Sequence, residues 1–112
     1  MDTGPFQLPS EIVEMCDVAK RIVHDELLPL EPQYLQHPGH SFGTNQTATN
    51  LKLVFGQDVL DHLTKISRET GLWYLMVPEE HGGSGLSMLA QIAIMEQFNY
   101  TAVPFPFAHV AN

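Results

Sequence analysis

Apolar residues recur at helical spacing along the first quarter of the chain. One stripe is formed by Ile12, Cys16, Ala19, Val23 and Leu27. The opposite face is mostly charged and carries Glu14, Asp17, Arg21 and Asp25. This pattern predicts an amphipathic surface helix that packs one stripe against a core. We expect the helix to span residues 10–28, with Ser10 as its N-cap, and to stop ahead of Pro29 and Pro32.

Two further stretches show helical spacing, near residues 57–70 and 87–100. In the first of them, five residues are expected to face inward: Val59, Leu60, Leu63, Ile66 and Ser67. Residues 33–50 are expected to form a loop, because they are rich in turn-forming residues and have no period. Residues 51–55 fit either the first turns of the second helix or a separate short turn. No run alternates with period two, so the predicted fold is all-α, a small bundle of three main helices joined by Gly- and Pro-rich loops, with no multi-stranded sheet.

A glycine-rich connector joins the second and third predicted helices. Gly71 fits the left-handed position just past a helix end. Pro78 cannot donate a backbone hydrogen bond, so residues 72–77 are expected to form a short, buried, extended segment. A tight double turn is expected at the glycines that follow, which are Gly82, Gly83 and Gly85. Ser87 is a suitable N-cap for the next helix, and the glycines match neither a phosphate loop nor a dinucleotide-binding fingerprint.

The third predicted helix is apolar on almost every side. Its apolar residues are Met88, Leu89, Ala90, Ile92, Ala93, Ile94, Met95 and Phe98. The sequence then stays mostly apolar over residues 103–110, whereas domain ends are usually polar and exposed. A helix of this kind is expected to be buried in a larger assembly. We therefore expect a domain over residues 1–112 that is incomplete at its C-terminal end. Its exposed apolar surface has four candidate residues: Leu89, Ile92, Phe105 and Phe107.

The composition is that of an acidic globular protein. The 112 residues are 44% hydrophobic, and the formal net charge is −8 at pH 7. The five basic residues form no dense patch; they are Lys20, Arg21, Lys52, Lys65 and Arg68. Neither a nucleic-acid partner nor an anionic membrane surface is therefore expected, since binding to both depends on basic residues that neutralise phosphates.

Cys16 is the single cysteine. It allows no internal disulfide and favours a reducing compartment. Its place on the apolar stripe favours a buried, unreactive thiol. The sequence shows neither a secretory signal nor a transit peptide, and no apolar run is long enough to span a bilayer. We expect a cytoplasmic protein, or a protein of the mitochondrial matrix if the source is eukaryotic.

Candidate catalytic groups are few. His37 and His40 have H-x-x-H spacing, but they lie in an expected loop and zinc ligands need rigid support, so no metal site is expected. Glu79 and Glu80 are adjacent and are interpreted as solvated turn residues. Glu96 lies on the apolar third helix, where a buried carboxylate needs a partner, and a structural role is favoured. No catalytic residue is assigned, because no Ser-His-Asp or Cys-His set can be assembled.

Three stretches resemble the N-terminal helical domain of the acyl-CoA dehydrogenases. Residues 71–87, GLWYLMVPEEHGGSGLS, resemble a specific helix–turn segment of that family. Residues 26–29, ELLP, are similar to the end of its opening helix, and residues 94–98, IMEQF, to its apolar helix. The resemblance covers most of the chain and implies the same helical domain. Residues 36–50 depart from the family pattern in length and polarity.

The resemblance implies part of a flavoprotein oxidoreductase of fatty acid metabolism, which oxidises the α,β bond of an acyl-CoA substrate. In that family a carboxylate removes the α-proton and FAD accepts the β-hydride. The flavin lies mainly on a middle β-domain and a C-terminal helical domain, and the latter supplies the base. The N-terminal domain contributes packing and part of the acyl pocket. By position, the pocket residues here are Phe105, Pro106 and Val110.

The isolated chain is therefore expected to be inactive. Its implied partners are the remaining flavin and C-terminal domains or a partner subunit, and the full protein is expected to be a homo-oligomer. The chain fits either a fragment or one product of a split gene. Two other readings stay open: a non-catalytic helical interaction module derived from that domain, and a free-standing small-molecule binding bundle.

Overall fold

The computed structural model describes residues 8–37 and 47–108. The first helical run consists of α1 (Ser10–Ile22), a π-helical turn η1 (Val23–Leu27), a 3-10 turn η2 (Leu28–Leu30) and α2 (Glu31–Gln36). Next come α3 (Thr47–Phe55), α4 (Gln57–Glu69) and two 3-10 turns, η4 (Leu72–Tyr74) and η5 (Glu79–His81). The last run is α5 (Met88–Glu96) with the 3-10 turn η6 (Gln97–Tyr100). These described residues contain no strand, which confirms the all-α fold.

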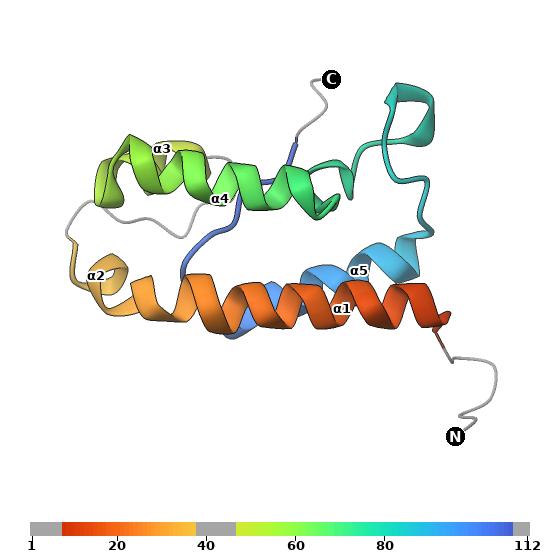
Figure 1. Cartoon of the computed structure of the whole chain (residues 1–112), viewed down its shortest axis with the longest axis horizontal. Coiled ribbons are helices and arrows are strands. Elements are labelled where there is room, and N and C mark those ends of the chain that lie inside the picture. The colour runs from red at the N-terminus through yellow and green to blue at the C-terminus, as the bar shows by residue number, and fades with distance from the viewer. Residues whose placement is uncertain (1–7, 38–46, 109–112) are drawn as a thin grey trace.

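The helices lie in two layers (Figure 1). α1 packs against α5 and η6 in one layer, and α3 packs against α4 in the other. Residues 101–108, called here the crossing segment, leave η6 and pass from the first layer to the second. The connector between α4 and α5 joins the layers at one end of the molecule.

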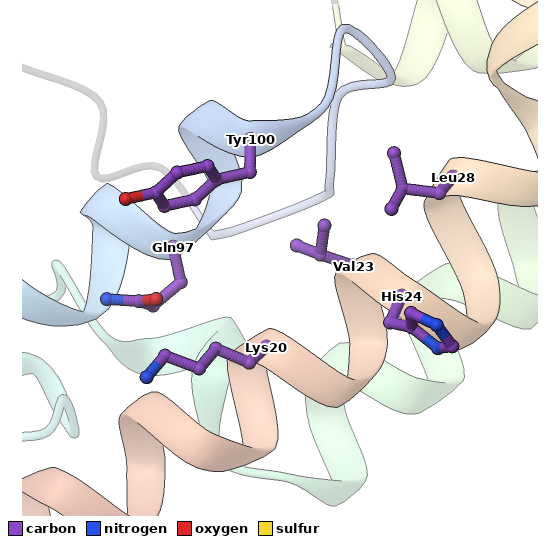
Figure 2. A pocket seen from close by; sticks show the side chains of 6 residues that line it. All are labelled: Lys20, Val23, His24, Leu28, Gln97 and Tyr100. Carbon is purple, nitrogen blue, oxygen red and sulfur yellow. The ribbon is translucent and has the colours of Figure 1, made fainter.

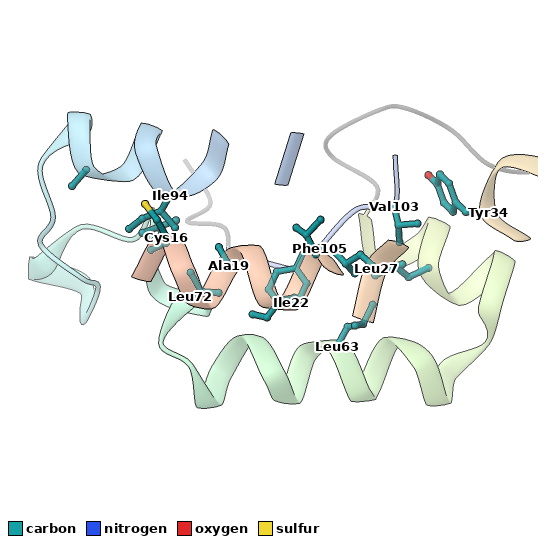
Figure 3. Close-up of a cluster of buried hydrophobic side chains, with 14 of the residues drawn as sticks. Cys16, Ala19, Ile22, Leu27, Tyr34, Leu63, Leu72, Ile94, Val103 and Phe105 are labelled. Atoms are coloured by element: carbon teal, nitrogen blue, oxygen red, sulfur yellow. The ribbon is translucent and has the colours of Figure 1, made fainter. Parts of the chain in front are cut away.

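Both layers and the crossing segment contribute to one core (Figure 3). The side chains that are almost completely buried include Leu27, Tyr34, Leu63, Leu72, Ile94 and Val103. Five residues of α4 are expected from the sequence to face inward. Leu63 lies within this core, and Val59, Leu60 and Ile66 pack against its edge. The fifth, Ser67, has no exposed surface. The amphipathic patterns of α1 and α4 therefore identify the faces that the fold buries.

Several local predictions are confirmed. Gly71 has a φ of 81°, the left-handed conformation that ends α4. Gly82 and Gly85 also have positive φ. The Ser87 hydroxyl accepts a hydrogen bond from the backbone N–H of Ala90 at 3.1 Å, so Ser87 caps α5 as expected. Gly83 serves close packing instead, because a Cβ there would lie 1.6 Å from the carbonyl oxygen of Val77.

The loop expected over residues 33–50 is wrong at both ends, since α2 reaches Gln36 and α3 begins at Thr47. Tyr34 of α2 is fully buried and its ring stacks on Phe55 of α3 with centroids 6.1 Å apart. This packing stabilises helices too short to be stable by themselves. Residues 51–55 belong to α3, which is separated from α4 by Gly56 at a φ of 94°.

Two other local predictions are also wrong. Pro9 occupies the N-cap of α1, and no side-chain hydrogen bond caps this helix, so Ser10 is its first helical residue. The Pro9 carbonyl already accepts from the N–H groups of Ile12 and Val13. Residues 72–77 are buried in part but are not extended. The described part of the chain has no strand to pair with them, so their N–H groups bond locally, as the Leu75 N–H does to the Leu72 carbonyl at 3.0 Å.

Candidate functional site

The crossing segment carries two of the three residues predicted to line an acyl pocket. Phe105 is only 5% exposed and Pro106 is also buried. Pro104, Phe107 and Ala108 on the same segment are half-buried. Val110 lies outside the described residues. The two pocket candidates that the structure describes are therefore buried residues, and the side chains with some exposed surface are their neighbours on the segment.

The sequence of the crossing segment explains its irregular backbone. Pro104 and Pro106 have no N–H group and fix φ, so the chain cannot continue the helix of η6 or pair fully as a strand. Two of its backbone polar groups bond to other elements near its far end. Ser67 of α4 donates its hydroxyl to the Pro106 carbonyl at 2.6 Å, and the Ala108 N–H donates to the Trp73 carbonyl at 2.8 Å.

Glu31 of α2 holds the start of the crossing segment. Its Oε2 accepts from the Thr101 hydroxyl at 2.8 Å and from the Ala102 N–H at 3.2 Å. The Thr101 hydroxyl in turn accepts from the N–H of Val103 at 3.2 Å. The segment is thus tied to α2 at one end and to α4 and η4 at the other.

Three phenylalanines form an aromatic cluster at the centre of the crossing segment. Phe105 stacks on Phe98 of η6 with centroids 5.0 Å apart. Phe107 meets both rings edge-on at 5.4 Å. Such offset and edge-to-face pairs add stability beyond their buried area. The cluster holds Phe105 in the core, so its predicted place on an exposed apolar surface is wrong, and Phe107 is half-buried.

α5 presents an apolar groove of about 530 Å³ to solvent. The groove is lined by Met76, Met88, Gln91, Ile92, Met95, Glu96 and Asn99. Leu89 and Ile92 are 58% and 55% exposed, which confirms these two candidates for an exposed apolar surface. Glu96 is exposed at the groove, so its carboxylate is solvated and needs no buried partner.

A smaller groove of about 270 Å³ lies where the π-helical turn meets η6 (Figure 2). Val23, Leu28 and Tyr100 give it apolar walls, with Lys20, His24 and Gln97 around them. π-helical turns are rare and often occur at functional sites. However, these side chains include no nucleophile paired with a base, so the groove offers no catalytic set.

The ionisable residues form no catalytic or metal centre in the described parts of the chain. His24 pairs with Asp25 at 2.8 Å and His62 with Glu26 at 2.9 Å, both at the surface. No group of three or more His, Cys, Asp or Glu side chains within residues 8–37 and 47–108 could hold a metal ion. His40 lies outside these ranges. Glu79 and Glu80 are exposed, as interpreted from the sequence.

Cys16 is buried at 7% exposure. Burial raises the pKa of its thiol, and the neighbouring Lys20 opposes that shift. A buried thiol with a raised pKa is a poor nucleophile, which agrees with the unreactive cysteine predicted. The helices in the described residues also include none long and apolar enough to cross a membrane.

Comparisons with known proteins agree on one family. The model of the acyl-CoA dehydrogenase N-terminal domain matches residues 10–112. A curated relative, (R)-benzylsuccinyl-CoA dehydrogenase of Thauera aromatica, is 30% identical over 102 residues. The aligned region covers 89% of this chain and 23% of the relative, so the chain spans less than a quarter of that protein's length. No solved structure matches the chain.

Proposed function

Because the chain belongs to the acyl-CoA dehydrogenase family, we propose that it forms the N-terminal helical part of a longer enzyme. That enzyme oxidises the α,β bond of an acyl-CoA thioester and uses FAD. The family match over residues 10–112 is the observation that carries this proposal. The two-layer, all-helical arrangement of the described residues supports it, since the family resemblance implies a helical N-terminal domain.

The described residues do not fit a flavin site by themselves. A flavin dinucleotide carries a pyrophosphate, which proteins hold with clustered N–H donors or basic side chains. The chain has five Lys and Arg residues against thirteen acidic ones. Arg68 lies over the ring of Trp73 at 4.6 Å, where it stacks on an aromatic face. Segments outside this chain would therefore hold the flavin and supply the base that removes the α-proton.

The part that this chain plays is to shape the site. The crossing segment would form part of the acyl pocket through Phe105 and Pro106, with Val110 beyond it. The half-buried Pro104 and Phe107 would present the apolar surface, and apolar contact favours an acyl chain over water. The described residues would thus bind the acyl chain and exclude water from it, and they would not move protons.

The exposed face of α5 supports the presence of further protein in the complete enzyme. Met88 is 70% exposed, and Leu89 and Ile92 are more than half exposed. Contiguous exposed apolar patches mark interaction surfaces. The flavin and C-terminal domains, or a partner subunit of a homo-oligomer, would cover this face. The same patch also favours the second candidate, a non-catalytic helical interaction module derived from the domain.

Dye-linked oxidation of an acyl-CoA tests the proposal. The isolated chain, mixed with FAD and an acyl-CoA, should bind no flavin stoichiometrically and reduce no dye. The protein purified from its source through a tag on this chain should carry flavin and reduce the dye. Turnover by the isolated chain that a single carboxylate substitution abolishes would contradict this division of roles. A source-purified protein without flavin and without turnover would favour the interaction module.

A further inference from the structure

We propose that Glu31 and Ser67 are positioning residues that set the acyl-chain preference of the enzyme by fixing the crossing segment at its two ends. This inference rests on the proposed function, because it assigns a role to the residues that hold the proposed pocket wall. Neither side chain needs to touch the substrate. They act through Thr101, Ala102 and Pro106.

The first end is fixed by one carboxylate oxygen. Oε2 of Glu31 accepts from both the Thr101 hydroxyl and the Ala102 N–H, across 70 and 71 residues of sequence. Hydrogen bonds to a charged group contribute more than neutral ones. These two bonds fix where the chain leaves η6 and turns towards α4.

The second end is fixed by a hydroxyl that has no exposed surface. Ser67 is 0% exposed and donates to the Pro106 carbonyl at 2.6 Å. Pro104 and Pro106 offer only carbonyls, so a donor on the neighbouring helix is needed to hold this stretch. A buried carbonyl left without its donor costs the full desolvation penalty, so loss of the hydroxyl would favour movement of Pro106.

Between these ends, Phe105 is held by the aromatic cluster, and Phe107, the residue after Pro106, is half-buried. Because Phe98 belongs to η6, the cluster holds the middle of the segment in place, and release of one end would move most the residues on that side of Phe105. A shift of this wall changes the room left for the end of an acyl chain. One methylene in an apolar pocket discriminates about 10- to 200-fold between substrates, so a small displacement is enough to change the preference.

Amide hydrogen exchange tests the anchoring on the chain itself. Three variants release or preserve an end: Glu31→Ala, Glu31→Gln and Ser67→Ala. The matched control is Thr70→Ala, which removes a hydroxyl at the C-cap of α4 that donates, among the described residues, to the Ile66 and Ser67 carbonyls. We expect Glu31→Ala to lower protection of the Ala102 N–H, and Ser67→Ala that of the Ala108 N–H, by roughly five- to tenfold.

Glu31→Gln keeps a carbonyl oxygen that can accept both bonds, so it should retain protection within about threefold. Thr70→Ala should leave the protection of the Ala102 and Ala108 N–H groups unchanged relative to the protection that global unfolding sets. Equal protection in wild type and Ser67→Ala, at equal global stability, would overturn the anchoring.

The substrate profile tests the specificity. In the tagged protein from its source, Glu31→Ala and Ser67→Ala should change the KM ratio between a short and a long acyl-CoA by roughly tenfold. The kcat on the best substrate should stay within about twofold, because neither side chain touches the reacting atoms. Thr70→Ala and Glu31→Gln should keep the wild-type ratio. An unchanged ratio in active variants with a loosened segment would overturn the inference. Absence of turnover in wild type would sink the proposed function and this specificity role with it, while the exchange data still decide the anchoring.

Discussion

α4 and α5 differ in how much of their apolar surface the chain itself covers. α4 is amphipathic, and its apolar stripe around Leu63 is buried while its charged face meets solvent. α5 is apolar on almost every side, but only Ala90 and Ile94 are buried. Its outer face, with Leu89 and Ile92, is exposed. The comparison shows that the amphipathic α4 completes its packing inside this domain, whereas α5 has an outer apolar face that no described part of the chain covers.

The buried face of α4 should show the largest loss of stability when side-chain volume is removed. Leu63 has no exposed surface and belongs to the core, so Leu63→Ala should lower the free energy of unfolding by about 3 kcal/mol. Urea unfolding followed by the emission of Trp73 measures the change. The control is Leu53→Ala on α3, where the side chain is 56% exposed and the cost should be much smaller. Equal costs at the two positions would contradict the difference between buried and exposed faces.

The connector between α4 and α5 should tolerate an alanine at Gly82 better than an alanine at Gly83. Gly83→Ala places a Cβ 1.6 Å from the Val77 carbonyl oxygen, so backbone must move, at a cost of roughly 2–3 kcal/mol. Gly82→Ala meets open space and carries only the left-handed strain of a φ of 83°, about 1 kcal/mol. Thermal unfolding of both variants gives the comparison. A larger loss for Gly82→Ala would show that strain, and not crowding, governs this turn.

The N-termini of α1 and α5 should differ in their dependence on serine. Ser87→Ala removes the hydroxyl that caps α5 and should cost about 1 kcal/mol. Ser10→Ala should change stability by less than about 0.5 kcal/mol, because no side chain caps α1. Denaturant midpoints at constant m-value report both changes. A cost at Ser10 equal to that at Ser87 would restore Ser10 as a cap.

The outer face of α5 should affect association more than stability. Replacing Leu89 and Ile92 together by Gln should change the free energy of unfolding by less than about 0.5 kcal/mol, since both side chains are more than half exposed. The same double variant should lower self-association and the binding of a hydrophobic dye. Sedimentation at several concentrations measures the former. Leu53→Gln is the matched control on α3.

A wild-type chain that is already a monodisperse monomer without dye binding would contradict the idea that α5 requires a partner. It would show that the domain is self-sufficient, and it would favour the interaction module over a part of a larger enzyme.

The sequence alone located the long helices and some of their ends. Periodicity identified α1, α4 and α5, because the buried stripe of a helix repeats every three to four residues. Gly71 and Ser87 were identified from local backbone rules, and Cys16 from its place on the apolar stripe. The same local pattern indicated that α5 has more apolar surface than so short a chain can cover, and Leu89 and Ile92 bear this out.

Only the tertiary structure decided α2, α3 and the course of the crossing segment. Tyr34 becomes helical core through contact with Phe55, and Phe105 is buried by Phe98 and Phe107 rather than exposed. The bonds from Glu31 to Thr101 and from Ser67 to Pro106 join residues 70 and 39 positions apart. A local sequence pattern does not identify such pairs, because their two residues meet only after the helices on both sides have packed. That packing offsets the entropy of closing the long loop between them.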